Sequence, residues 1–234
     1  MKKATIILGI MLMAGVGLAG CKSTYKLESG KMVQRAIVYM NFGEYEQAIN
    51  TLRASLEVEY ENPATHYWLG RCYELTTNTR QGIDEYRLAV RFNPAMEAAQ
   101  MALIMALHQS RQEDESILAT QEYLKHRAGL AGDVIQLAQD FLSKGMDKQA
   151  ILAFERAQEL SPTDPTPLMA LANYYKSKGD QENEKEAVRR AAIIGPYYAG
   201  LAQRAGSQGI KVESPQPKPY PKTSDLDKAL RDIK

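Results

Sequence analysis

The sequence has few residues that bind metals, and it lacks the charge that nucleic-acid-binding domains carry. Only 3 histidines and 2 cysteines occur among its 234 residues, which leaves little for a metal site. Lys and Arg number 29 against 28 Asp and Glu, so the strong basic excess of a nucleic-acid-binding domain is missing. Hydrophobic residues at 44% and charged residues at 24% are the usual globular mixture, which excludes a mainly disordered chain.

Recognisable catalytic motifs are also missing from the sequence. It contains no nucleophile elbow, no phosphate-binding glycine loop and no CxxC motif. His66, His108 and His126 lack the i, i+4 spacing of a helical zinc site, and we expect them on the surface or in a groove. We therefore predict a protein that is not an enzyme, with no catalytic residue, metal, cofactor or small-molecule substrate.

The first twenty residues have the form of an export signal. Lys2 and Lys3 precede an apolar run over residues 4–16, which is shorter than the roughly 20 residues that span a bilayer. The run ends in Leu-Ala-Gly-Cys at residues 18–21. An ordinary cleavage site that happens to contain a cysteine is the alternative interpretation.

The sequence Leu-Ala-Gly-Cys resembles the lipobox of bacterial lipoproteins. The resemblance implies a diacylglyceryl group on Cys21, cleavage before it and acylation of the new terminus, and two or more acyl chains anchor a protein stably. Lys22 stands where an Asp typically retains a lipoprotein at the inner membrane, so we expect the outer membrane, periplasmic face, with residues 21–28 as a lipidated tether. In a Gram-positive source the same anchor implies the outer face of the cell membrane.

A period of 34 residues runs through the body of the chain, with units starting at residues 29, 63, 97, 131 and 165 and no insertion between them. Position 8 is small in four of the five units, and position 11 is a large apolar or aromatic residue in all five. Position 8 holds Ala36, Gly70, Ile104, Ala138 and Ala172. Position 11 holds Tyr39, Tyr73, Leu107, Phe141 and Tyr175, and position 20, small in the first four units, holds Ala48, Gly82, Ser116, Ala150 and Glu184.

These columns resemble the tetratricopeptide repeat (TPR). The resemblance implies an all-α fold, a right-handed superhelix (α-solenoid) of about five helix-turn-helix repeats that share one core. The repeats are expected over residues 29–62, 63–96, 97–130, 131–164 and 165–198.

Two features of the repeats are less regular. Glycine occupies position 15 of units one, four and five, where a helix end needs a positive φ, and in unit two we expect Asn78 to take that conformation. Unit three misses the pattern at Ile104, at Arg111, at Tyr123, whose position 27 holds Ser or Ala in the other units, and at Ala128, so a distorted repeat or a shifted helix is expected there.

Composition changes after the repeats. Residues 197–205 predict a short capping helix within the segment 197–210, and proline at alternate positions of residues 211–222 favours an extended linker. Leu226, Ala229, Leu230 and Ile233 then form one apolar stripe, which predicts a short amphipathic helix over residues 223–234. A frayed tail is the alternative.

Cys72 lies inside an apolar helical pattern. If Cys21 is lipidated, Cys72 has no intramolecular partner. We expect a buried, inert thiol, with a redox role as the alternative.

In TPR proteins the first helix of each repeat lines a concave groove, and the resemblance implies that positions 5 and 9 contact the ligand. Position 5 holds Val33, Tyr67, Met101, Ile135 and Met169, and position 9 holds Ile37, Arg71, Met105, Gln139 and Asn173. Position 5 is apolar or aromatic throughout, which excludes the carboxylate-clamp TPRs with lysine there. A Met-rich apolar groove suits an amphipathic helix or an extended segment with hydrophobic anchors. Alternatively, the superhelix itself or the C-terminal stripe covers these residues.

The lipobox and the repeats together resemble bacterial TPR lipoproteins, which include pilotin-type lipoproteins of pilus and secretion systems. The resemblance implies a membrane-anchored scaffold that faces the periplasm and binds protein partners during assembly of an envelope complex. Pilus or secretin biogenesis is the favoured context. An adaptor for a cell-envelope hydrolase or protease is the alternative.

Overall fold

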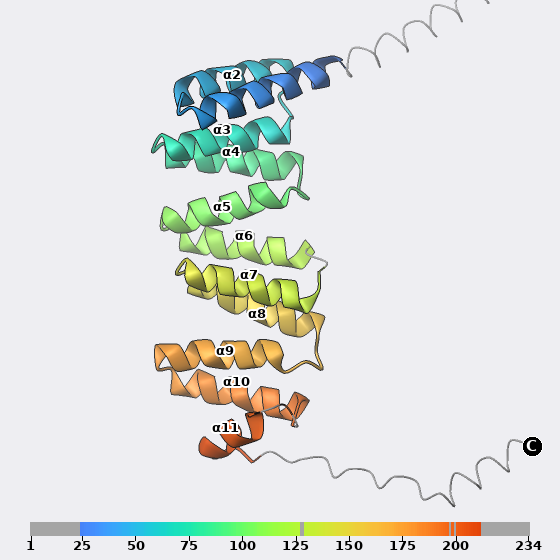
Figure 1. Ribbon diagram of the computed structural model, residues 1–234, viewed down its shortest axis with the longest axis vertical. Helices are drawn as coiled ribbons and strands as arrows, with labels where there is room; N and C mark the ends of the chain where they lie inside the picture. Colours follow the sequence, from blue (N-terminus) through green and yellow to red (C-terminus); the bar gives the residue numbers. More distant parts are fainter. Residues whose placement is uncertain (1–23, 127–128, 197, 199, 212–234) are drawn as a thin grey trace, which may run out of the picture. The chain divides into compact units, whose positions relative to one another are not determined.

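The computed structural model describes residues 24–126, 129–196, 198 and 200–211, and every regular element within these residues is a helix (Figure 1). This confirms the predicted all-α class. The chain divides into two compact units, Met1–Arg127 and Ala128–Lys234. The predicted signal peptide, Cys21, residues 212–222 of the predicted linker and the predicted C-terminal helix lie outside the described residues, whereas residues 24–28 of the predicted tether belong to a helix.

The first unit contains three helical hairpins. A helix over residues 24–41 is followed by α2 (Tyr45–Val58), α3 (Pro63–Leu75), α4 (Thr79–Phe92), α5 (Glu97–Gln109) and α6 (Glu113–His126). Each helix packs on the next along the chain, so the hairpins form a stack (Figure 1). Because α2, α4 and α6 begin at residues 45, 79 and 113, each starts 34 residues after the previous one. The third repeat therefore keeps the register, and the helix shift expected there does not occur.

The second unit contains two hairpins and a short last helix. Its elements are α7 (Ala131–Ser143), α8 (Asp147–Leu160), α9 (Thr166–Lys178), α10 (Gln181–Ile194) and α11 (Leu201–Ser207). The expected capping helix thus begins at Leu201 rather than at residue 197. A turn precedes it, in which the Leu201 N–H donates to the Tyr198 carbonyl at 3.0 Å and Gly200 has a φ of +76°.

Small residues let the two helices of the second repeat cross with their backbones in contact. A Cβ atom on Gly70 would lie 2.6 Å from the Tyr86 ring and 3.1 Å from the Gly82 carbonyl oxygen. In the third repeat the same two positions hold Ile104 and Ser116, and the Ser116 hydroxyl donates to the Ile104 carbonyl at 3.0 Å. The small columns of the sequence therefore mark the crossing points of these two hairpins.

Position 15 has a left-handed backbone in all five repeats. Its φ angles are +76° at Gly43, +64° at Thr77, +59° at Arg111, +73° at Gly145 and +73° at Gly179. The expectation for Asn78 is wrong: its φ is −90°, and it is the N-cap of α4. The repeat register imposes the conformation on Thr77, because the Asn78 N–H must reach back to the Tyr73 carbonyl at 2.8 Å to close the helix end.

Buried polar groups join the first and second repeats. The Ser55 hydroxyl lies 2.9 Å from the Ser29 hydroxyl and 3.1 Å from the Thr65 hydroxyl, and the Asn62 amide donates to the Ser29 hydroxyl at 2.8 Å. These bonds connect the helix over residues 24–41 to α2 and to the start of α3. One face of the first helix is thereby fixed against its own repeat and the next.

His66 is buried with only 1% of its surface exposed, so the expectation of a surface or groove position is wrong for this residue. Its Nδ1 lies 2.6 Å from a Glu85 carboxylate oxygen, and its Nε2 lies 2.7 Å from the Tyr60 carbonyl oxygen. The ring also stacks on Phe92 with a centroid distance of 5.4 Å. A polar partner at each ring nitrogen and an aromatic neighbour make this interior position suitable for a histidine side chain.

Cys72 is a free, buried thiol, as the sequence predicts. It packs in the first core cluster together with Leu69 and Tyr73. Burial raises its pKa to about 11, so the thiol is neutral at physiological pH. Within the described part of the chain, none of the helices has the length and apolar character required to cross a bilayer.

Candidate protein-binding groove

The predicted groove residues of the first unit lie on the first helix of each hairpin, and four of them belong to α3 and α5. Tyr67, Arg71, Met101 and Met105 are partly exposed, as is Ile37 on the helix over residues 24–41. Their side chains are thus reachable while their stems pack on the repeats. That they bind a ligand stays a prediction.

Val33 does not take the predicted position in a groove. Only 4% of its surface is exposed, and it packs in the core cluster with Ala36 and Leu52. Position 5 of this first helix therefore points into the core. Ile37, one turn further along, is partly buried and packs against that cluster.

Aromatic rings support the groove side of α3. The Tyr67 ring lies edge-on to Trp68 with a centroid distance of 5.2 Å, and 6.1 Å from the ring of Tyr86 on α4. Tyr67 also packs against the second core cluster, which contains Ile83 and Leu103. These contacts hold its ring in place, which lowers the entropy that a ligand contact would cost.

A small polar network lies one turn further along α3. The Tyr86 hydroxyl donates to a Glu74 carboxylate oxygen at 2.8 Å, and the same oxygen lies 3.5 Å from a guanidinium nitrogen of Arg71. Burial and the Glu74 carboxylate raise the pKa of Tyr86, so this phenol remains a neutral donor. The Arg71 contact is long and 42% of its side chain is exposed. Arg71 is therefore free to turn towards a ligand at little cost.

Two methionines and a histidine follow one another along α5. Met101, Met105 and His108 are partly exposed, and their spacing of four and three residues places them on one face of the helix. His108 Nδ1 lies 3.0 Å from a Glu113 carboxylate oxygen at the start of α6. The two methionines of this face offer flexible apolar contacts, and His108 adds a polar group at its end.

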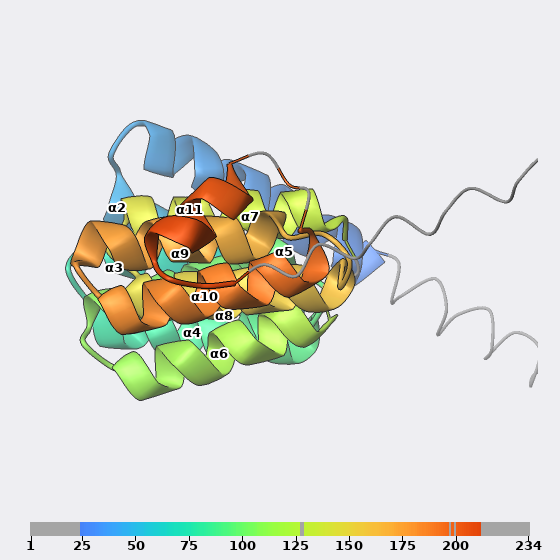
Figure 2. The ribbon, with the colours of Figure 1, turned by 90° about the horizontal axis from the view of Figure 1, so that it is seen from below.

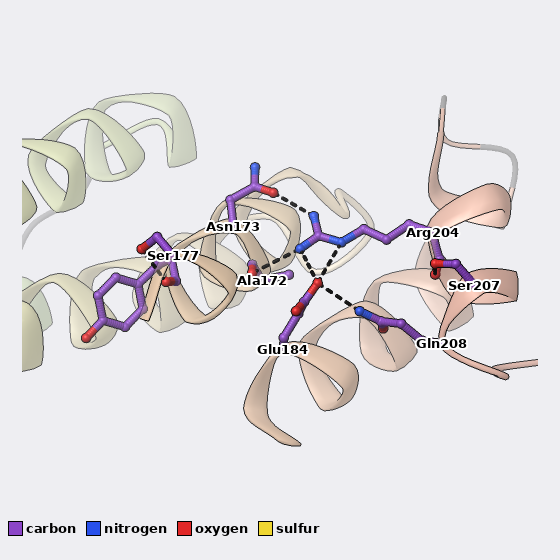
Figure 3. Close-up of polar contacts among 8 residues, drawn as sticks. Ala172, Asn173, Ser177, Glu184, Arg204, Ser207 and Gln208 are labelled. Carbon is purple, nitrogen blue, oxygen red and sulfur yellow. Dashed lines mark hydrogen bonds and ion pairs between the residues drawn. The ribbon is translucent and has the colours of Figure 1, made fainter. Parts of the chain in front are cut away.

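In the second unit the capping helix contacts part of the predicted groove. Ile135 on α7 is partly exposed and Gln139 is exposed. On α9, however, Met169 packs against the cluster that contains Leu201 of α11, and the amide oxygen of Asn173 accepts a 2.6 Å hydrogen bond from Arg204 (Figure 3). In Figure 2, α11 lies over α9 and α10. Thus α11 contacts two predicted groove residues of the last repeat, while Asn173 stays exposed and Met169 stays partly exposed.

Glu184 explains why position 20 of the last repeat is not small. Its side chain is 11% exposed, and its Oε1 accepts bonds from Arg204 Nη2 at 2.8 Å, from Arg204 Nε at 3.2 Å and from Gln208 at 2.8 Å. Arg204 also donates to the Ala172 carbonyl at 3.0 Å (Figure 3). A buried carboxylate requires a cationic partner. A glutamate at a position that is small in the other repeats is therefore the sequence signal that could have indicated the contact between Glu184 and Arg204.

The described residues contain no group of three or more His, Cys, Asp or Glu side chains that could hold a metal ion. The side chains of the candidate groove that reach the surface are instead apolar, aromatic, amide or singly charged. Such a surface can bind a polypeptide segment through hydrophobic anchors and one or two polar contacts.

Comparison with known proteins supports the repeat assignment. The profile of the tetratricopeptide repeat family matches residues 33–97. The search of curated proteins found no match.

Solved structures include proteins of similar fold. YrrB, a TPR protein with an unusual peptide-binding site, is 19% identical, with 75% of this chain and 90% of that chain covered and a TM-score of 0.45. PilF of Pseudomonas aeruginosa is 16% identical, with 89% and 99% covered and a TM-score of 0.45. A thermophilic TPR protein of Thermus thermophilus is 18% identical, with 77% and 98% covered and a TM-score of 0.42.

The helical hairpins and the family match together establish the class of the fold. The described chain is an α-solenoid of helix-turn-helix repeats, with a tetratricopeptide match over residues 33–97. Repeats of this kind generally act as scaffolds for protein–protein interaction rather than as enzymes.

Proposed function

We propose that the protein is a lipid-anchored scaffold on the periplasmic face of the outer membrane, where it binds a protein partner during assembly of an envelope complex. Pilus or secretin biogenesis is the favoured context. The observation that carries the proposal is the set of partly exposed apolar side chains on α3 and α5, namely Tyr67, Met101 and Met105. The lipobox-like sequence that ends at Cys21 supports the anchor.

The chemistry of this surface defines the partner segment. Tyr67 is held by neighbouring rings, whereas the two methionines adapt to side chains of different shape. Arg71, one turn after Tyr67 on α3, suits a carboxylate. The ligand is therefore an amphipathic helix or an extended segment with two or three hydrophobic anchors and an acidic residue near them.

The test is a crosslinked pull-down from envelope membranes with the full mature chain. Tyr67→Ala combined with Met105→Ala should lose the partner while the helical circular dichroism spectrum is retained. Leu118→Ala on α6 is the control, because Leu118 is 64% exposed and lies on the second helix of its hairpin. This control should capture as much partner as the wild type.

The captured proteins decide the context. Secretin or pilus subunits support the proposed assembly role, whereas a cell-envelope hydrolase or protease supports the adaptor role. Capture that is equal for the wild type and the groove variant contradicts binding at Tyr67 and Met105.

A further inference from the structure

The helix over residues 24–41 exposes a face that is both apolar and basic. Leu27 is 61% exposed, Val38 50% and Phe42, just after the helix, 77%. At about 100° per residue these three side chains project within about 60° of one another. Lys31 and Arg35 lie on the same face and are also exposed. Three large apolar groups and two cations thus share one side of the first helix.

The opposite side of this helix is already occupied. Ser29, Val33 and Ala36 are buried against α2 and α3. Their directions on the helix are roughly opposite to those of Leu27 and Val38. The helix's own repeat therefore does not cover the exposed apolar side chains.

The equivalent face of the second repeat packs on the hairpin before it. Lys31 and Arg35 occupy positions 3 and 7, and the same positions of the second repeat hold the buried Thr65 and Leu69. There they pack on the preceding hairpin. At the end of a repeat stack the outer face is normally polar, for solubility. Here it keeps cations but also carries large hydrophobic groups, which points to a binding surface.

We propose that this face docks on the anionic phospholipid surface of the membrane, a proposal that rests on the lipid anchor of the proposed function. Residue 24, the first described residue of this helix, follows Cys21 by three positions, and three residues of chain reach at most roughly 10 Å. A lipid on Cys21 therefore holds the start of the helix at the level of the headgroups. Leu27, Val38 and Phe42 enter the interface while Lys31 and Arg35 meet the phosphates.

The charge balance of the helix favours a membrane over an apolar protein surface. Lys26, Lys31 and Arg35 oppose a single carboxylate, Glu28, which lies 3.8 Å from the ammonium group of Lys31 and is 56% exposed. Each cation near an anionic leaflet strengthens binding about fivefold. Lys26, Leu27, Gly30, Lys31 and Gln34 also line a shallow hollow beside this face. A basic helix with large apolar groups is the type that lies in a membrane interface.

The experiment is flotation of the full mature chain, made without the lipid through Cys21→Ser, on vesicles of phosphatidylcholine and phosphatidylglycerol at 3:1. The Cys21→Ser protein with an otherwise unchanged face should float at least about tenfold better with these vesicles than with vesicles of pure phosphatidylcholine. Leu27→Glu with Phe42→Glu should lower flotation at least about tenfold, and Lys31→Glu with Arg35→Glu should remove the preference for anionic lipid. Circular dichroism melting verifies that each variant is folded.

Leu118→Glu is the matched control, because Leu118 is 64% exposed against 61% for Leu27 and lies in the same unit. It should float like the wild type. Flotation that is absent in the wild-type chain, or lost equally in the control, overturns the proposal. A dimer that dissociates in the Phe42→Glu variant, seen by light scattering, also overturns it, because the face then joins two copies of the chain.

The vesicle assay is independent of the anchor. Mass spectrometry of the Cys21 peptide from membrane-extracted protein tests lipidation by itself. Flotation without lipidation retains the docking face and rejects the anchor, whereas lipidation without flotation rejects the docking face and leaves the anchor intact.

Discussion

Thr77 has a left-handed backbone, with a φ of +64°, which a β-branched residue rarely adopts. We expect Thr77→Gly to stabilise the protein by about 1 kcal/mol, since glycine adopts this conformation without a clash between Cβ and the backbone. The free energy of unfolding from urea titration checks this. Ser110→Gly is the control. Ser110 has a φ of −81°, so glycine there should destabilise the protein by up to about 1 kcal/mol. A gain in both variants contradicts a backbone origin.

The Cys72 thiol should be unreactive in the folded protein. Burial raises its pKa to about 11, from the ordinary 9.0, and only the thiolate attacks a disulfide reagent. The protonated thiol is favoured in the folded state, so this contribution to stability is complete below about pH 9 and is lost as the pH rises through 11. Ellman's reagent at pH 8 should therefore modify Cys72 only after addition of urea. Rapid reaction without urea would indicate that the packing around Cys72 opens in the folded protein.

Glu184 and Arg204 act as a pair that fastens α11 to the last repeat. Arg204→Ala should cost about 3 kcal/mol, because it leaves the Glu184 carboxylate buried without its partner. Adding Glu184→Ala should recover part of that loss, since alanine is the residue found at the same position of the first and fourth repeats. A double-mutant cycle of unfolding free energies measures the coupling. Strictly additive effects would show that the pair does not help to fasten α11.

The helices themselves were predictable because their causes are local or periodic. Small residues such as Gly70 and Gly82 mark where the helices of a hairpin cross, and the period of 34 residues fixes where each helix begins. The misses involve contacts between residues far apart in the sequence. Glu184 departs from the small residues of position 20 because Arg204 of α11 lies beside it, and His66 lies inside because Glu85 and Tyr60 provide polar partners for its two ring nitrogens.

The groove was predicted less completely than the repeats. The prediction that Val33, at position 5 of the first helix, lines the groove is wrong, because Val33 packs in the core cluster formed with α2 and α3. Position 9 of the last repeat was placed on the correct helix, but Asn173 is engaged by Arg204. A column rule assumes that every repeat has the same neighbours, and the first and last repeats do not. The central repeats, with Tyr67, Met101 and Met105, are where the rule is safest.

Binding and stability should separate between two tyrosines of α3. Tyr73 is 6% exposed and its hydroxyl accepts a 2.9 Å bond from Arg53, so Tyr73→Ala should cost roughly 3–5 kcal/mol of stability. Tyr67→Ala removes a partly exposed ring and should cost about 1 kcal/mol, yet it should weaken partner binding. Thermal melting and the pull-down assay measure the two effects. Equal stability losses in both variants would show that Tyr67 belongs to the core rather than to the groove.

Membrane attachment of the whole protein should depend on one of its two cysteines. Cys21→Ala removes the site of lipid attachment, so we expect the protein in the soluble fraction after a high-salt wash, or as an unprocessed precursor of larger mass. Cys72→Ala is the control, because Cys72 is buried in α3 and takes no part in the anchor. This variant should pellet at its mature size.

The salt wash separates the acyl anchor from the docking face of the first helix. Acyl chains bind through about 0.8 kcal/mol per buried CH₂, which salt does not screen, whereas the contacts of Lys31 and Arg35 with phosphates weaken as the ionic strength rises. Cys21→Ala protein that pellets in low salt and is released in high salt therefore fits both proposals. Mature-sized Cys21→Ala protein that stays in the pellet after the wash contradicts the lipobox interpretation, because another part of the chain must then hold the protein on the membrane.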